Sequence, residues 1–298
     1  MQVLLNYREE VMSLTEQQEL LLAAIRRNDG NEIQKLLTEH KKILNWPKYE
    51  KHTPLHLAVR HDRFEIIKLL LEKNAFLNQK DENDKTALHL AAKLGRSEII
   101  KLLLEQNAPV DEKDSFSDDT PLYHATRNGH AETVKLLLEK GASLSGKSMS
   151  GATALHIAAG NGHSDTVKLL LEQRASLTEK NKNGETALDF AASNGHSTTV
   201  KLLIDQGARI DGKTNNGRTV LHIAVSNNHS ETIKLLLEKG ASLHEKDNNG
   251  LTALHIAARN GHLNTIKLLL EKGTSPNEKQ HGEIAVLYWA ANKGYFAL

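Results

Sequence analysis

The stretch DNNGLTALHIAARNGHLNTIKLLLEKG, residues 247–273, contains one complete structural unit. It opens with DNNG, a turn sequence, because Asp and Asn side chains bond their own backbone and glycine permits a positive φ. Thr252 follows, where its side chain can accept a backbone N–H and cap a helix. Leu254, Ala257 and Ala258 then give that helix an apolar stripe. The first half of the unit is therefore a turn followed by a short capped helix.

A second helix completes the unit. The Asn-Gly pair at 260–261 ends the first helix, and the segment TIKLLLEK at 265–272 is typical of the second. Gly273 lies just past its end, where a left-handed residue commonly closes a helix. Helices of about eight to ten residues are too short to be stable alone in water. Stability must then come from packing against neighbouring units.

Such neighbours are present, because the hexapeptide TALHIA recurs along the chain. Its copies are TPLHLA at Thr53, TALHLA at Thr86, TPLYHA at Thr120, TALHIA at Thr153, TALDFA at Thr186, TVLHIA at Thr219, TALHIA at Thr252 and a worn copy, AVLYWA, at Ala285. They are spaced by 33 residues, with one interval of 34. This period and motif resemble the ankyrin-repeat family over nearly the whole chain. The resemblance implies an all-α solenoid of helix–turn–helix repeats joined by β-turn or hairpin loops.

The repeat phase divides the chain into three segments. Residues 1–48 are expected to form an N-terminal helical extension and a degenerate capping repeat, in which Ser13 and Glu16 fit a capping box. Residues 49–280 should hold seven repeats, and residues 281–298 a truncated eighth. The seven repeats are 49–81, 82–115, 116–148, 149–181, 182–214, 215–247 and 248–280.

The position that closes each second helix is filled by Gly or Asn in every repeat but one. Both residues tolerate the left-handed conformation that this position requires. Arg174 is the exception. We expect its loop to be strained or to close differently.

Two segments imitate a phosphate-binding loop. GASLSGKS at 141–148 and GARIDGKT at 207–214 both match G-x-x-x-x-G-K-[ST]. A true phosphate-binding loop needs a strand before it and a helix directly after it. Here a helix precedes each segment and a turn follows, so we expect no nucleotide to bind and no cofactor to be used.

Sixteen histidines invite a metal hypothesis. Five recur in the first helix and five in the loop after it: His56, His89, His156, His222 and His255, then His130, His163, His196, His229 and His262. Repetition in every unit indicates a structural role. In ankyrin repeats the first of these histidines braces the turns, and the resemblance implies the same here. No ligand set such as H-E-x-x-H is present, so no metal site is expected.

Composition limits the partners. The chain has 298 residues, 25% of them charged, a net charge of +1 and no cysteine. Nothing in this balance draws it to nucleic acid or to membranes, and no signal peptide or membrane span is visible. We expect a cytoplasmic protein in a reducing compartment, or alternatively one secreted into a host cell without a cleavable signal peptide. We expect a monomer with weak self-association through its ragged C-terminal end.

The variable positions predict where a partner binds. In this family they lie just before the Thr and at the end of the first helix. The C-terminal half fills them mostly with Asn, which turn geometry explains. The N-terminal half differs, and we expect its residues to bind a protein partner on the concave face: Tyr49, His52, Arg60, His61, Lys93, Leu94, Phe116, Arg127 and Met149.

We therefore expect a non-enzymatic protein–protein interaction module or scaffold. One alternative is a bacterial effector that is delivered into a host cell and acts by the same binding. An alternative from another class is a nucleotide-binding enzyme that uses the two GK[ST] loops. No catalytic residue is predicted, since no nucleophile with a positioned base is visible.

Overall fold

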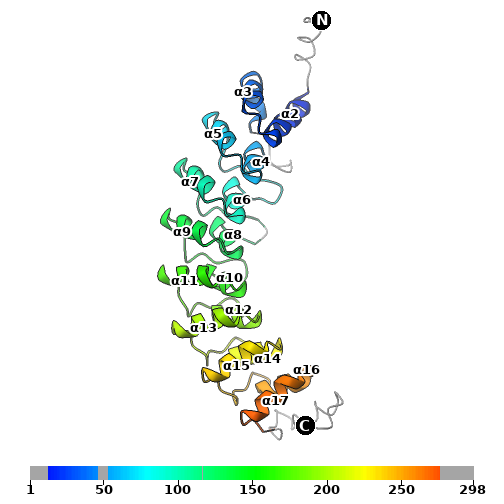
Figure 1. The fold of residues 1–298 in the computed structure, drawn as a ribbon, viewed down its shortest axis with the longest axis vertical. Coiled ribbons are helices and arrows are strands. Elements are labelled where there is room, and N and C mark those ends of the chain that lie inside the picture. The colour runs from blue at the N-terminus through cyan, green and yellow to red at the C-terminus, as the bar shows by residue number, and fades with distance from the viewer. Residues whose placement is uncertain (1–12, 46–52, 116, 276–298) are drawn as a thin grey trace, which may run out of the picture. The chain divides into compact units, whose positions relative to one another are not determined.

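A computed structural model describes residues 13–45, 53–115 and 117–275. The described residues form α-helices α2 to α17 and one 3₁₀ helix, with no strand among them (Figure 1). The predicted all-α fold is thus confirmed. The chain separates into two compact units, Met1–Ser143 and Leu144–Leu298, called unit 1 and unit 2 below.

Each repeat contributes an inner helix, which follows the Thr, and an outer helix. In unit 1 the helices are α2 (Leu14–Arg27), α3 (Gly30–Glu39), η1 (Lys41–Ile43), α4 (Pro54–Arg60), α5 (Phe64–Glu72), α6 (Ala87–Leu94), α7 (Ser97–Glu105), α8 (Pro121–Arg127) and α9 (Ala131–Glu139). In unit 2 they are α10 (Ala154–Gly160), α11 (Ser164–Glu172), α12 (Ala187–Ser193), α13 (Ser197–Asp205), α14 (Val220–Ser226), α15 (Ser230–Glu238), α16 (Ala253–Asn260) and α17 (Leu263–Glu271).

Within each unit the inner helices pack side by side, and so do outer helices. In unit 1, α4 lies between α2 and α6, and α6 packs on α8. In unit 2, α12 lies between α10 and α14, and α14 packs on α16. The small inner-helix residues, such as Ala91 and Ala92, are fully buried and admit the apolar side chains of the outer helix, such as Ile99, Ile100 and Leu103. Burial of these side chains against neighbours supplies the stability that a single short helix lacks.

The outer helices of the repeats from α5 to α17 close in the same way. In most repeats a Gly or Asn with positive φ follows the helix, as at Asn74 (φ 67°) and Gly141 (φ 91°). Arg174 adopts the same conformation, with φ 66°, and its N–H donates to the carbonyl of Leu171 just as that of Asn74 does to Leu71. The expectation that this loop closes differently is therefore wrong. The strain expected at a large side chain in this conformation remains.

The N-terminal pair, α2 and α3, is helical as the degenerate repeat predicts. The capping box at its start is confirmed: the N–H of Ser13 donates to Glu16 Oε2 at 2.8 Å, and the N–H of Glu16 donates to Ser13 Oγ at 3.3 Å. The expected extension at residues 1–12 and the truncated repeat at 281–298 lie outside the described residues.

Candidate functional site

The first-helix histidines join consecutive repeats. In α6 the N–H of Thr86 donates to Nδ1 of His89 at 3.1 Å, so this nitrogen carries no proton. Nε2 therefore carries the proton and donates to the carbonyl of Asp119, in the next repeat, at 3.2 Å. His156 and His222 make the same pair of bonds, to the carbonyls of Glu185 and Leu251. Both ring nitrogens are thus used within the fold.

Burial keeps these rings neutral. Desolvation lowers the pKa of His89 to about 4, and it also lowers the pKa of His156 and of His222. The neutral ring is the form that donates at one nitrogen and accepts at the other. The bracing role implied by the family resemblance is therefore what the geometry shows at these positions.

The loop histidines form a second set of bridges. Nε2 of His130 donates to the carbonyl of Lys93 at 3.0 Å, and that of His229 to the carbonyl of Ser193 at 2.9 Å. Each ring lies over a glycine of the preceding repeat: a Cβ added to Gly95 would meet the ring of His130 at 2.7 Å. Glycine is required at Gly95 both by this close approach and by its φ of 68°.

The two GK[ST] segments hold their lysines in ion pairs. Lys147 Nζ lies 2.7 Å from Glu179 Oε2, and Lys213 Nζ lies 2.8 Å from Glu245 Oε2. Each segment follows an outer helix, α9 or α13, and a turn separates it from the next inner helix. Neither has the strand-loop-helix context that positions backbone N–H groups around a phosphate.

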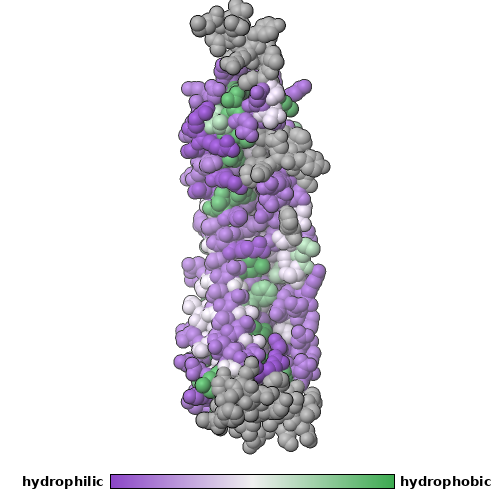
Figure 2. Space-filling model, turned by 90° about the vertical axis from the view of Figure 1, so that its right-hand side faces the viewer, coloured by the Kyte–Doolittle hydropathy of each residue, from purple (hydrophilic) through white to green (hydrophobic). Residues whose placement is uncertain are grey.

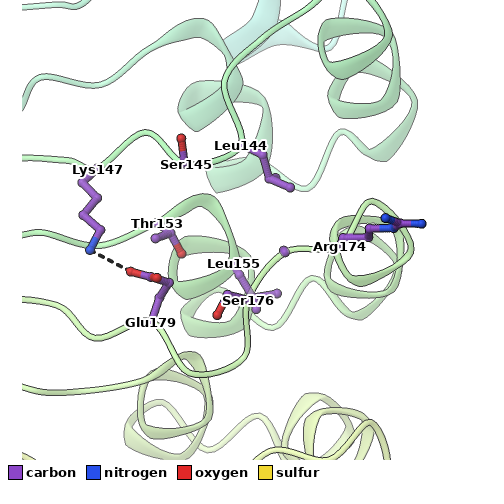
Figure 3. Close-up of a pocket in the computed structure, with 9 residues that line it drawn as sticks. Leu144, Ser145, Lys147, Thr153, Leu155, Arg174, Ser176 and Glu179 are labelled. Atoms are coloured by element: carbon purple, nitrogen blue, oxygen red, sulfur yellow. Dashed lines mark ion pairs between the residues drawn. The ribbon is translucent and has the colours of Figure 1, made fainter.

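A groove of about 380 Å³ borders the first of these lysines. Its lining includes Leu144, Thr153, Leu155, Ser176 and the Lys147–Glu179 ion pair; Figure 3 shows the two charged side chains facing each other and Arg174 pointing away. A groove of about 260 Å³ recurs one repeat later, beside Lys213. Because it recurs with the repeat, the groove is explained by the packing of successive loops.

Four predicted partner-binding residues lie at the ends of two neighbouring inner helices of unit 1. Arg60 and His61 end α4, Lys93 and Leu94 end α6, and all four are exposed. Within the described part of the chain, Arg60 and Lys93 make no ion pair. The structure therefore brings two cations and an apolar side chain, Leu94, onto one surface. This set of four residues is called the inner-helix end patch below.

Arg127 occupies the corresponding position at the end of α8, but its side chain forms an ion pair. Its Nη2 lies 2.7 Å from Oδ2 of Asp119, a carboxylate with no exposed surface, while the Arg127 side chain itself is 42% exposed. Met149 is 56% exposed and belongs to unit 2. Tyr49, His52 and Phe116 lie outside the described residues.

Corresponding positions in unit 2 carry asparagines that are used by their own helices. Nδ2 of Asn161 donates to the carbonyl of Ile157 at 2.8 Å, and Nδ2 of Asn227 to that of Ile223 at 3.0 Å. Each carbonyl also accepts the backbone N–H of the same asparagine, so the side chain adds a second bond at the helix end. His61 and Leu94 make no such side-chain bond among the described residues, so they remain available for other contacts.

The face viewed in Figure 2 is largely hydrophilic, with only scattered hydrophobic residues. The large apolar side chains that are exposed in the described residues are few: Leu14, Leu20, Phe76, Leu94 and Met149. Of these, Leu94 is the one that stands at the end of an inner helix beside an exposed cation, Lys93. A partner would meet a polar surface with a small apolar centre.

Comparison with known families decides the identity of the repeats. The family model described as ankyrin repeats (3 copies) matches residues 1–81, 76–148, 145–214, 210–280 and 240–297. The chain belongs to the ankyrin-repeat family. Ankyrin repeats generally mediate protein–protein interaction, and the family is typically a non-enzymatic interaction module. Comparison with curated proteins finds no sequence that matches this chain. Among the described residues no helix is long and apolar enough to cross a bilayer.

The structure also shows what the asparagines at the ankyrin-repeat turn tips do, which sequence reasoning assigned to turn geometry alone. In unit 2 the N–H of Asn215 donates to the carbonyl of Asn183 at 2.9 Å, and its Nδ2 donates to the carbonyl of Lys182 at 2.9 Å. Asn248 repeats this pattern one repeat later. The tips of successive ankyrin repeats are thus joined to one another. The recurrence of Asn at the same position of successive repeats was the sequence feature that could have predicted these bonds.

Sequence reasoning missed one group of side chains at the junction of the second and third ankyrin repeats. Asp114, Asp119 and His124 are buried together near the end of the loop that carries the extra residue. His124 escaped notice because it stands one residue after the position where most other repeats have His. The departure from the repeat pattern, TPLYHA in place of TALHIA, was the sequence feature that could have drawn attention to this group.

Proposed function

We propose that the ankyrin repeats of unit 1 bind a protein partner on the concave face, with the inner-helix end patch at the centre of the contact. One observation carries the proposal: Arg60, His61, Lys93 and Leu94 are exposed, while the asparagines that stand in unit 2 at the positions of His61 and Leu94 are bonded to their own helices. Residues that the fold does not use are the ones free to recognise a partner.

The patch indicates the partner's chemistry. Packed helices lie about 8–10 Å apart, so Arg60 and Lys93 present two positive charges at roughly that spacing. Leu94, 36% exposed, lies beside Lys93. A complementary segment would place acidic groups near the two cations and an apolar side chain on Leu94. Paired charges of this kind raise the association rate and select the partner, while a few central residues carry most of the affinity.

The proposal also covers the oligomeric state of the protein and the class of its partner. With a net charge of +1, the protein is proposed to act as a monomer on proteins, and not on nucleic acid or membranes. The same patch would serve in the cytoplasm of the producing cell or, for an effector, in a host cell that receives the protein. We propose no catalytic step.

Site-specific photo-crosslinking in cells tests the proposal and identifies the partner. A photoreactive amino acid at residue 94 should capture a distinct protein. The matched control places the same amino acid at Asn216 or Asn249, exposed turn-tip residues of unit 2. Equal capture of the same protein at all three positions, or capture from the unit 2 positions only, would show that the patch is not the binding centre.

A further inference from the structure

Three side chains at the junction of the second and third repeats converge in the interior of unit 1. Asp114 follows α7 at the start of the turn, Asp119 ends the turn, and His124 lies on α8. One potential ligand atom from each lies within 4.8 Å of the others. Their side chains are 1%, 0% and 5% exposed, respectively.

The repeat architecture explains only one of the three. Asp114 Oδ1 accepts the N–H groups of Ser117 and Asp119, just as Asp81 and Asp247 organise the turns of other repeats. His124 occupies a position that is apolar in the other described repeats, filled by Leu57, Leu90, Ile157, Phe190, Ile223 and Ile256. Asp119 stands where Lys85 and Leu251 stand in their repeats. Turn formation therefore does not account for His124 or for Asp119.

One buried oxygen of this cluster is left without a hydrogen-bond donor among the described residues. Two carboxylates are buried, and one guanidinium, that of Arg127, faces Asp119 Oδ2 at 2.7 Å. Asp119 Oδ1 is buried and accepts no hydrogen bond from the part of the chain that the structure describes. Fully buried acceptors without a partner are uncommon, because desolvation is then uncompensated. A cation at Asp119 Oδ1 would supply the missing partner.

The spacing of two of these groups is close to that of a pair of metal ligands. Nε2 of His124 and Oδ2 of Asp114 are 3.1 Å apart. Two ligands on a tetrahedral ion with bonds of about 2.0–2.1 Å are separated by roughly 3.3 Å, so a small expansion seats an ion between them. Replacement of the proton on Nε2 by the ion would then leave the imidazole neutral with its proton on Nδ1.

We infer that Asp114 Oδ2, Asp119 Oδ1 and His124 Nε2 form a binding site for Zn²⁺, with water completing a tetrahedron. One imidazole with two carboxylates gives the nitrogen and oxygen donors that Zn²⁺ accepts, and two negative charges match its double charge. Arg127, being 42% exposed, can leave Asp119 for solvent when the ion binds. No metal site was predicted from the sequence because only the histidines that recur at a fixed position were considered, and His124 is not one of them.

The site also has a supporting shell. Nε2 of His89 donates to the backbone carbonyl of Asp119, and the rings of His89 and His124 meet edge-on with centroids 5.7 Å apart. The backbone of Asp114 is tied to that of Asp119 by an N–H···O bond of 3.0 Å. These contacts hold the ligand-bearing segments in place before an ion arrives, as outer groups commonly do for metal ligands.

Calorimetric titration of the chelator-treated full chain with Zn²⁺ tests the inference, together with the visible absorption of bound Co²⁺. The wild-type protein should bind one ion with the Co²⁺ spectrum of a tetrahedral site, and Zn²⁺ should raise its melting temperature. His124→Leu, which installs the side chain found at Leu90, should weaken Zn²⁺ binding by at least about 100-fold. Asp119→Asn, nearly identical in shape, should do the same if His124→Leu alters the fold by circular dichroism.

The control is His244→Gln, which removes an exposed histidine of unit 2 and should leave the affinity unchanged. Equal affinity of wild type, His124→Leu and Asp119→Asn would overturn the inference, because the ions would then sit on other histidines. Failure of the wild type to bind Zn²⁺ at millimolar concentration would overturn it as well.

Discussion

Replacement of Asp189 by His should stabilise the protein above pH 7. Asp189 stands in α12 where the neighbouring repeats have His156 and His222. Its Oδ2 accepts the N–H and the Oγ–H of Thr186, both at 2.8 Å, so the cap of α12 is intact. An ionised carboxylate has no proton to donate to the next repeat, whereas His222 donates to the carbonyl of Leu251.

The size of the expected stability gain follows from the burial of the Asp189 carboxylate and from the hydrogen bond to the next repeat that Asp189 cannot make. Burial raises the pKa of Asp189 from 3.8 to about 6. At about 1.36 kcal/mol per pKa unit, ionisation of this group in the folded state costs at most about 3 kcal/mol of stability at neutral pH. The restored hydrogen bond to the next repeat adds roughly 1 kcal/mol. After the cost of ordering the larger ring, we expect Asp189→His to gain about 1–3 kcal/mol, or roughly 3–8 °C in melting temperature.

The gain should depend on pH with a definite sign. Because the pKa of Asp189 is raised on folding, the folded protein binds more protons than the unfolded chain between pH 3.8 and about 6, and stability from this group falls as pH rises through that window. A buried His behaves oppositely, since burial lowers its pKa, as at His222, and acid then favours the unfolded chain. Asp189→His should therefore be more stable than wild type at pH 7.5 and less stable at pH 4.5.

Urea denaturation followed by circular dichroism at both pH values measures this, with Asp189→Asn as the control that removes only the charge. Relative to wild type, Asp189→Asn should show part of the stability gain of Asp189→His at pH 7.5 and little gain at pH 4.5. A stability change of the same sign and size at both pH values would refute the reasoning, because it would show that the carboxylate is not the destabilising group.

Two further predictions concern the glycines and the loops that resemble phosphate-binding loops. Gly195→Ala should lower the free energy of unfolding in urea by about 1–3 kcal/mol, because the new Cβ would meet the His229 ring at 2.6 Å and the φ of this residue is 73°. The control is Gly212→Ala, which should be nearly neutral because the nearest atom that its Cβ would meet is 3.6 Å away. Equal losses in the two variants would contradict this account of the histidine bridges. Calorimetry should find no micromolar ATP or GTP binding to the wild type, and a micromolar affinity lost in Lys147→Ala/Lys213→Ala would show that the GK[ST] segments are functional.

The repeat fold was accessible from sequence because each local signal is repeated at a fixed phase. Thr caps such as Thr86, the apolar pairs of the outer helices and the glycines after them all point to the same structure. Arg174 shows the limit of a residue preference: neighbouring repeats impose a conformation that the side chain alone disfavours, and the loop closes as the others do.

The candidate sites were accessible only in part. Exposure of Arg60 and Leu94 follows from their phase in the repeat, but the bonds that engage Arg127 and Asn161 depend on atoms that sequence does not place. The group formed by Asp114, Asp119 and His124 was missed because it consists of residues that break the pattern. In a repeat protein, deviations of this kind in a single repeat carry information about function that the shared motif does not.

The most direct test of the proposed function is the affinity of the partner captured at residue 94 for a set of purified variants. Leu94→Ala and Arg60→Ala/Lys93→Ala should each weaken binding by more than about 1 kcal/mol without lowering the melting temperature, and the loss from the charge variant should shrink at high salt. Asn216→Ala and Asn249→Ala, in the polar unit, should leave the affinity unchanged. If the asparagine variants weaken binding more than the Leu94 and Arg60/Lys93 variants do, the inner-helix end patch is not where this protein recognises its partner.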